Sequence, residues 1–252
     1  MSQPLKPLKW YRKLASEKGR LEAGAFLIEG DRAIKQIANS RNQEIIEIVT
    51  VKEPPSSYYD YVVRYVTESQ FRSISNAVTP QGIMAVVRLP QDTCTDELPA
   101  SIGSRVLLLE DVQDPGTVGT LIRTAAAFDY SGIILTGKCA DPFSPKCVQA
   151  TAGTVLAQWL RRTPRYLELI QALKKRGYFL VAADLGGTED TSVFRGIEKL
   201  VLALGSEASG LTPGLLDLAD HRLRIPIARE KAESLNVASS GAICMYLSNT
   251  IT

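Results

Sequence analysis

Five short apolar runs, separated by stretches of helical spacing, constrain the fold of the second part of this chain more than any other feature. They are residues 106–109, 132–135, 179–183, 200–204 and 223–227. A short, mostly apolar run without polar alternation is typical of a strand that is covered on both faces. The order of strands and helices therefore predicts an α/β domain with a mostly parallel sheet and helices on both faces.

A smaller α/β module precedes this domain. Its expected elements are helices at 10–21 and 31–37 and strands at 25–29, 45–51 and 83–87. The polar, proline-containing segment 89–102 has the composition of a linker. We therefore expect two domains, residues 1–97 and 98–252, each within the usual size range.

No segment of the sequence has the composition of a membrane span. The chain is 45% hydrophobic and 22% charged, which is ordinary for a soluble globular protein. No apolar run is long enough to cross a bilayer, and the N-terminus lacks the apolar core of a signal peptide. We expect a cytoplasmic protein without a membrane partner.

The cysteines and the single histidine argue against a metal centre. Cys94, Cys139, Cys147 and Cys244 show no CxxC spacing, and His221 is the one histidine of the sequence. Zinc sites usually need such clusters, so we expect no metal site and a reduced protein. The same shortage of histidine argues against Ser-His or Cys-His catalysis.

Basic residues are concentrated near the N-terminus, although the net charge of the chain is only +2. Residues 1–20 contain a single acidic side chain, Glu17, and a set of basic ones that includes Lys9, Arg12, Lys13, Lys18 and Arg20. Such a segment can follow a phosphate backbone. It can equally be the solvated face of a helix, and both interpretations stay open at this point.

A first candidate site follows the strand at 106–109. The turn-forming segment 114–119 leads into an apolar helical run that contains Arg123. Ligands of open α/β sheets gather where strands end and helices begin. The segment lacks the GxGxxG fingerprint of dinucleotide-binding proteins, which disfavours a nicotinamide-dependent enzyme. Taken alone, Arg123 could equally pair with a carboxylate or cap a loop.

Two more candidate segments follow the strands at 200–204 and 223–227. In the first, Gly205 permits close backbone approach, Gly210 permits an unusual dihedral, and Glu207 could orient a basic group. In the second, Ser234 is the expected N-cap of a helix rich in small residues. Such a helix lets a flat ligand or another backbone approach closely, which indicates the rim of a small-molecule site.

Together the three segments resemble the SpoU (TrmH) family of the SPOUT superfamily of RNA methyltransferases. The matching residues are Thr117, Gly119 and Arg123-Thr124-Ala125, then Gly205-Ser206-Glu207, Gly210 and Leu211, and finally Ile225-Pro226-Ile227 and Ser234-Leu235-Asn236-Val237. Residues 20, 26–30 and 80–83 are similar to the family's ribosomal-protein-like RNA substrate-binding domain. Thr117 and Ser206 stand where the family motifs have Asn, and Gln149 stands where many relatives have Arg.

The resemblance implies methyl transfer from S-adenosylmethionine to a ribose 2′-hydroxyl of RNA. It also implies a trefoil-knotted C-terminal domain and a homodimer formed through that domain, for which the helix at 238–247 is the candidate interface. The separate N-terminal module favours ribosomal RNA as substrate. Transfer RNA is the alternative, and the changes at Thr117 and Ser206 leave open a non-catalytic RNA-binding relative.

The resemblance also assigns roles to residues. The implied cofactor-binding residues are Leu204, Gly205, Ile225, Ile227, Ser234 and Leu235. The implied catalytic residues are Arg123, Glu207, Ser234, Asn236 and Thr117, and Arg123 also joins the basic residues Lys9, Arg12, Lys13, Lys18 and Arg20 as an RNA contact. A guanidinium has a pKa above about 12 and is a poor base. We therefore expect Arg123 to grip a phosphate and to stabilise the developing alkoxide.

Overall fold

The computed structural model describes residues 6–41, 44–228 and 230–251. Contacts divide the chain into two compact units. The first contains the described residues up to Gln91 together with Asp141–Leu156, and the second contains Asp92–Ala140 and the described residues from Ala157 onward. The predicted division after residue 97 does not include the return of 141–156 to the first unit, because that return depends on contacts between residues far apart in the sequence.

The first unit is built on a four-stranded sheet in the order β1-β4-β2-β3. Its strands are β1 (Ala25–Glu29), β2 (Ile45–Thr50), β3 (Val63–Tyr65) and β4 (Ile83–Arg88). β4 is antiparallel to both of its neighbours, whereas β3 runs parallel to β2. The strand β3 was not predicted, because three residues at a sheet edge carry too short a pattern to recognise.

Short helices accompany this sheet. They are α1 (Leu8–Lys13), α2 (Glu17–Ala23), α3 (Asp31–Arg41), η2 (Ser56–Tyr58), α4 (Glu68–Arg72) and α6 (Pro145–Thr151). The predicted single helix at 10–21 is in fact two helices. The chain turns at Ser16, whose hydroxyl accepts a hydrogen bond from Gly19 N and so caps α2.

The second unit contains a six-stranded, wholly parallel sheet in the order β10-β8-β9-β5-β6-β7. Its strands are β5 (Arg105–Glu110), β6 (Gly132–Leu135), β7 (Trp159–Arg162), β8 (Phe179–Thr188), β9 (Leu200–Gly205) and β10 (His221–Leu223). The prediction of a mostly parallel sheet is confirmed. The predicted strand at 223–227 is wrong, because β10 ends at Leu223, before the proline at 226. The strand β7 was missed.

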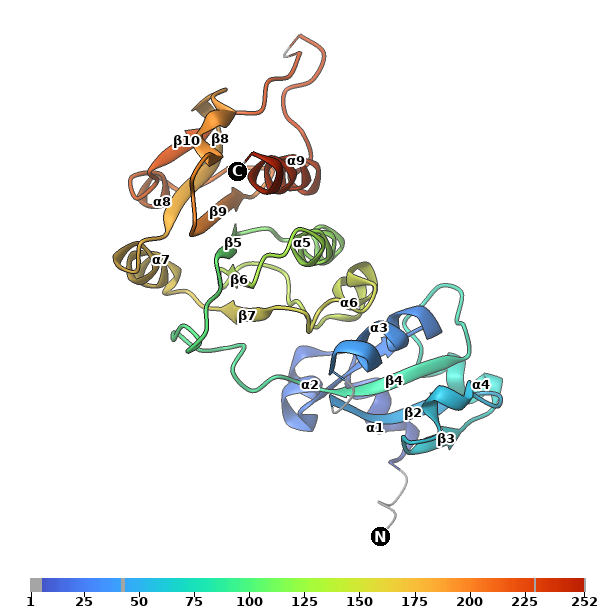
Figure 1. Cartoon of the computed structure of the whole chain (residues 1–252). Helices are drawn as coiled ribbons and strands as arrows, with labels where there is room; N and C mark the ends of the chain where they lie inside the picture. Colours follow the sequence, from blue (N-terminus) through green and yellow to red (C-terminus); the bar gives the residue numbers. More distant parts are fainter. Residues whose placement is uncertain (1–5, 42–43, 229, 252) are drawn as a thin grey trace. The chain divides into compact units, whose positions relative to one another are not determined.

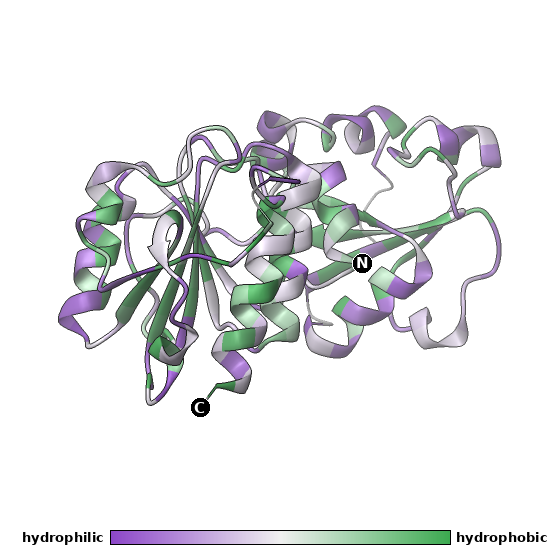
Figure 2. Ribbon diagram, turned by 90° about the horizontal axis from the view of Figure 1, so that it is seen from above, coloured by the Kyte–Doolittle hydropathy of each residue, from purple (hydrophilic) through white to green (hydrophobic). Residues whose placement is uncertain are grey.

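The helices of the second unit are α5 (Pro115–Ala127), α7 (Tyr166–Lys175), η3 (Thr191–Phe194), α8 (Pro213–Leu216) and α9 (Val237–Thr250). Figure 1 shows α7 and α8 on one side of the sheet and α5 and α9 on the other, so the predicted cover on both faces is confirmed. Apolar side chains fill the strands, and hydrophilic residues gather on loops and outer helix faces (Figure 2).

The order in which the strands are added to this sheet indicates where a ligand is expected to bind. The chain enters at β5, adds β6 and β7 on one side, and then returns to add strands on the other side. β5 and β9 are neighbours, and their last residues, Glu110 and Gly205, are paired. The carboxyl ends of both strands therefore lie side by side where the strand order reverses, which is the usual place for a ligand in such sheets.

Candidate functional site

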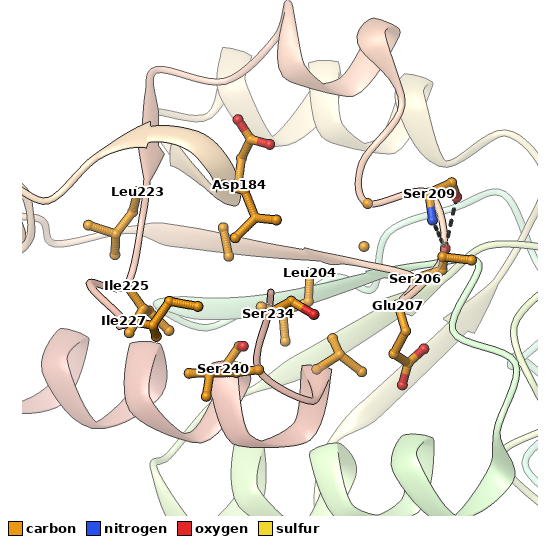
Figure 3. Close-up of a pocket in the computed structure, with 17 residues that line it drawn as sticks. Asp184, Leu204, Ser206, Glu207, Ser209, Leu223, Ile225, Ile227, Ser234 and Ser240 are labelled. Atoms are coloured by element: carbon orange, nitrogen blue, oxygen red, sulfur yellow. Dashed lines mark hydrogen bonds between the residues drawn. The ribbon is translucent and has the colours of Figure 1, made fainter. Parts of the chain in front are cut away.

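A pocket of about 360 Å³ lies at the carboxyl ends of β8 and β9. Four segments line it, namely 183–185, 204–210, residues 223, 225 and 227 around the end of β10, and residues 234–240 in part. Figure 3 shows their side chains around the opening. The segment 183–185 reaches the pocket because the pairing of β8 with β10 skips from Ala182 to Thr188, so that the intervening residues bulge out of the ladder.

The turn after β9, residues 206–210, is tightly folded beside this pocket. Gly210 N donates a hydrogen bond to Ser206 O at 3.0 Å, and Gly210 has a φ of +64°. A Cβ on Gly205 would lie 2.2 Å from the carbonyl carbon of Gly210, so only glycine fits at this position. The Ser206 and Ser209 hydroxyls are 2.8 Å apart and close the turn further.

The ionisable side chains in the described pocket lining are two carboxylates, Asp184 and Glu207. Asp184 accepts hydrogen bonds from Arg222, with its Oδ2 2.9 Å from Nε and 2.5 Å from Nη2. Glu207 is exposed, and its carboxylate has no hydrogen-bond or ion-pair partner within the described parts of the chain. The pocket therefore carries an unneutralised negative charge, which favours a cationic ligand.

All six predicted cofactor residues line this one pocket. They are Leu204, Gly205, Ile225, Ile227, Ser234 and Leu235. The sequence places them in three separate segments, and the fold brings them together because β9 and β10 both end at the same edge of the sheet. Of the predicted catalytic residues, Glu207 and Ser234 belong to the same lining.

Arg123, Thr117 and Asn236 do not line the pocket. Arg123 lies in the third turn of α5, is exposed, and forms no hydrogen bond or ion pair with any described residue. Thr117 is half-buried in the first turn of the same helix. The helices α5 and α9 pack so closely that a Cβ on Gly241 would lie 2.5 Å from Leu121 Cδ2.

The expected N-cap of the C-terminal helix is wrong by two residues. Asn236, rather than Ser234, caps α9, with its Oδ1 accepting a hydrogen bond from Ala238 N at 2.9 Å. Both residue types are good caps, so the local pattern could not decide between them. The correction leaves the Ser234 hydroxyl in the pocket lining and leaves the NH₂ group of Asn236 as its remaining donor.

The basic N-terminal residues separate into two groups. Lys9, Arg12, Lys13 and Lys18 are exposed. Arg20 is 3% exposed, and its guanidinium donates to Leu14 O at 2.8 Å and to the Asp141 carboxylate. The prediction that Arg20 contacts RNA is therefore corrected, because this side chain holds the first unit together and is not at its surface.

Sequence reasoning missed two residues near the pocket. Asp184 lines the pocket, and Glu110 lies at the carboxyl end of β5 beside Gly205. Each is an acidic residue that ends an apolar run, which is a signal that could have been used. Glu110 is 1% exposed, and burial of this kind can be known only from the fold.

Comparison with known proteins decides the family. A family model described as the SpoU rRNA Methylase family matches residues 104–246, which is more than half of the chain. The chain belongs to the SpoU rRNA methylase family. A second model, the MRM3-like substrate binding domain, matches residues 6–85. The predicted membership and the predicted N-terminal substrate-binding domain are thus confirmed.

Similar proteins match this family member over nearly its whole length. The 23S rRNA (guanosine(2553)-2′-O)-methyltransferase RlmP of Bacillus subtilis is 30% identical, over 95% of this chain and 94% of its own. The 23S rRNA (uridine(2479)-2′-O)-methyltransferase of Streptomyces viridochromogenes is 26% identical, over 94% of this chain and 86% of its own.

Solved structures agree with the fold. A TrmH-family protein from Porphyromonas gingivalis superposes with a TM-score of 0.83 at 29% identity and covers 100% of both chains. An AdoMet-bound rRNA methyltransferase from Sinorhizobium meliloti superposes with a TM-score of 0.81 at 30% identity, over 98% of this chain and 96% of its own.

The pocket residues of this family member fit S-adenosylmethionine. The volume of about 360 Å³ lies within the usual range for small-molecule sites, about 300–1,000 Å³. Apolar side chains such as Leu204 and Ile225 offer walls for an adenine ring, and the turn after Gly205 lies beside them. The unneutralised Glu207 suits a ligand with a positive sulfonium and would repel the phosphates of a dinucleotide.

Proposed function

We propose that this protein transfers a methyl group from S-adenosylmethionine to a ribose 2′-hydroxyl of ribosomal RNA. The observation that carries the proposal is the pocket in which all six implied cofactor residues meet beside an unpaired carboxylate. Membership of the SpoU family and the AdoMet-bound relative support the same conclusion. None of the described helices is long and apolar enough to cross a membrane. We propose that the protein acts on this RNA in the cytoplasm.

S-adenosylmethionine, when bound, supplies a methyl carbon made electrophilic by the attached sulfonium. The chain then has to align the ribose oxygen with that carbon, and positioning of this kind can supply a large share of the acceleration. The exposed guanidinium of Arg123 binds the phosphate next to the target ribose and stabilises negative charge on the 2′-oxygen as the hydroxyl proton passes to solvent water. The Glu207 carboxylate and the free NH₂ group of Asn236 orient these groups.

Ribosomal RNA is the proposed substrate because of the N-terminal unit and the named relatives. The substrate-binding model matches residues 6–85, and the two curated relatives both act on 23S rRNA. The exposed basic residues Lys9, Arg12, Lys13 and Lys18 supply positive charge for the phosphate backbone. Methylation of transfer RNA instead would contradict this part of the proposal.

We also propose that two copies associate through α9. Ile243 is 37% exposed and Tyr246 is 55% exposed on this helix, and Tyr246 stacks edge-on against Phe128. Exposed apolar side chains of this size in one place are typical of interaction surfaces. In such a dimer, Arg123 of one copy, which lies outside the pocket lining of its own chain, could serve the pocket of the partner.

A trefoil knot in the C-terminal segment is part of the same proposal. β10 lies at the outer edge of the sheet beside β8, whereas α9 packs on α5 and β9. The described residues between β10 and α9 therefore lead from the edge to the middle of the sheet, and Ile225, Ile227, Ser234 and Leu235 share the pocket with the turn 206–210. Tracing residues 200–245 in a crystal structure would test whether the C-terminal segment passes through a loop of the chain, as a trefoil knot requires.

The decisive experiment measures both binding and transfer. We expect S-adenosylmethionine to bind the purified protein in isothermal titration calorimetry, and 23S rRNA to gain one 2′-O-methyl group on incubation with both. Mass spectrometry of nuclease fragments would locate that group. If the protein bound no S-adenosylmethionine and the RNA gained no methyl group, the non-catalytic RNA-binding alternative would be favoured. The changes at Thr117 and Ser206 left that alternative open.

A further inference from the structure

A buried carboxylate at the end of β5 has no part in the proposed reaction. Glu110 is 1% exposed and forms no ion pair within the described residues. Burying a carboxylate costs several kcal/mol unless hydrogen bonds compensate it. Three donors do so here, namely the Tyr166 hydroxyl, Thr212 N and Thr212 Oγ1, the last two at 2.7 Å.

The donors come from two helices that follow other strands. Tyr166 is the first residue of α7, and Thr212 is the N-cap residue of α8. The Thr212 hydroxyl does not cap its own helix. Both donors of Thr212 therefore go to Glu110 instead. Burial, and then the hydrogen bond to Glu110, raise the pKa of the Tyr166 hydroxyl to about 12, so Tyr166 remains a donor at neutral pH.

Glu110 thereby holds the far end of the pocket turn. The turn begins at Gly205, which pairs with Glu110 in the sheet, and it ends at Thr212, which bonds to the Glu110 side chain. Residues 206–210 between these two points line the pocket and carry Glu207. The backbone of Glu110 therefore pairs with the start of the turn at Gly205, and its carboxylate binds the end of the turn at Thr212.

We propose that Glu110, with Tyr166 and Thr212, is a positioning residue that holds the turn 206–211 in the conformation that binds the cofactor. The identity of that cofactor rests on the proposed function. A turn fixed at both ends before binding loses less conformational entropy when the ligand arrives, which increases affinity. Glu110 itself lies outside the pocket lining.

We call Glu110, Tyr166 and Thr212 the clamp. Substitutions at Glu110 separate the effect of its charge from the effect of its hydrogen bonds. Glu110→Ala leaves the Thr212 N–H and two hydroxyls without their acceptor. Glu110→Gln keeps a carbonyl oxygen for Thr212 N, and its NH₂ group can donate to the hydroxyls after they rotate. We expect S-adenosylmethionine affinity to fall about tenfold or more in Glu110→Ala and less in Glu110→Gln.

Tyr166→Phe and Tyr178→Phe form a matched pair. Tyr178 also donates one hydrogen bond, to Gly103 O, but it lies beside the amino end of β8, away from the pocket. Removing the Tyr166 hydroxyl should raise the KM for S-adenosylmethionine while kcat at saturating cofactor stays close to wild type. Removing the Tyr178 hydroxyl should leave the KM unchanged.

Hydrogen exchange of the cofactor-free protein tests the clamp directly. Amides of residues 206–212 should exchange faster in Glu110→Ala and Tyr166→Phe than in wild type, and no faster in Tyr178→Phe. Unchanged exchange, or a cofactor Kd within twofold of wild type in Glu110→Ala, would overturn the proposal. If Glu110→Ala does not fold, Tyr166→Phe decides on the same two measurements. If the wild-type protein bound no S-adenosylmethionine, the proposed function would be wrong. The hydrogen-exchange rates of residues 206–212 would still test the clamp, because they are measured without cofactor.

Discussion

Substitution of Arg123 should change the activity of the protein without changing its stability. The side chain is exposed and makes no polar contact with the described residues, so Arg123→Ala should change the free energy of unfolding by about 0.5 kcal/mol or less. We expect it nearly to abolish methyl transfer while leaving S-adenosylmethionine affinity almost intact. A methyltransfer assay and calorimetry would measure the two effects. Arg176→Ala, an exposed arginine near the amino ends of the strands, is the matched control.

Gly205 is a position where the backbone itself excludes a side chain. Because a Cβ there would lie 2.2 Å from Gly210 C and 2.5 Å from Leu211 N, Gly205→Ala must displace the turn that lines the pocket. We expect a loss of S-adenosylmethionine affinity of about tenfold or more, measured by calorimetry. Gly214→Ala, where the nearest atom would be Leu167 Cδ1 at 3.7 Å, should bind normally. Normal binding by Gly205→Ala would show that the turn is not part of the cofactor site.

At the scale of one element, the start of α9 distinguishes the residue that caps the helix from the residue that lines the pocket. Asn236 caps the helix, so Asn236→Ala should cost about 1 kcal/mol and lower the Tm by about 2–4 °C. Ser234 lies in the pocket and caps nothing, so Ser234→Ala should leave the Tm unchanged while weakening cofactor binding or transfer. Thermal unfolding and calorimetry on the two variants would test this contrast, and equal loss of Tm in both would contradict the assignment of the cap.

The elements also show where sequence patterns are sufficient. Strands β5, β6, β8 and β9 were recognised because buried parallel strands are apolar runs, which a sequence shows directly. Strand β7 (Trp159–Arg162) was missed because two of its four residues are arginines. Arg161 nevertheless is buried, since its guanidinium bonds to Glu97 O and Asp92, and no local pattern predicts that pairing.

At the scale of the whole molecule, the proposed association through α9 makes a clear prediction. Ile243→Glu with Tyr246→Glu places charges on the exposed apolar face of that helix, and burying them in an interface would be costly. We expect wild type to sediment as a dimer at micromolar concentration and the double variant to sediment as a monomer. Val78→Glu, at a fully exposed apolar residue of the first unit, should leave the dimer intact. A monomeric wild type would refute the proposed association.

The amino-acid sequence by itself determined the class of fold, the order of the three motifs and part of the pocket lining, without Asp184. Apolar runs, glycine turns and small-residue helices are local patterns, and the parallel sheet then brings the ends of neighbouring strands together. Tertiary structure alone decided that Arg20 is buried against Asp141, that β10 stops at Leu223, and that Glu110 fixes the pocket turn. These features depend on desolvation and on partners 100 or more residues away in two of the three cases, which no local pattern encodes.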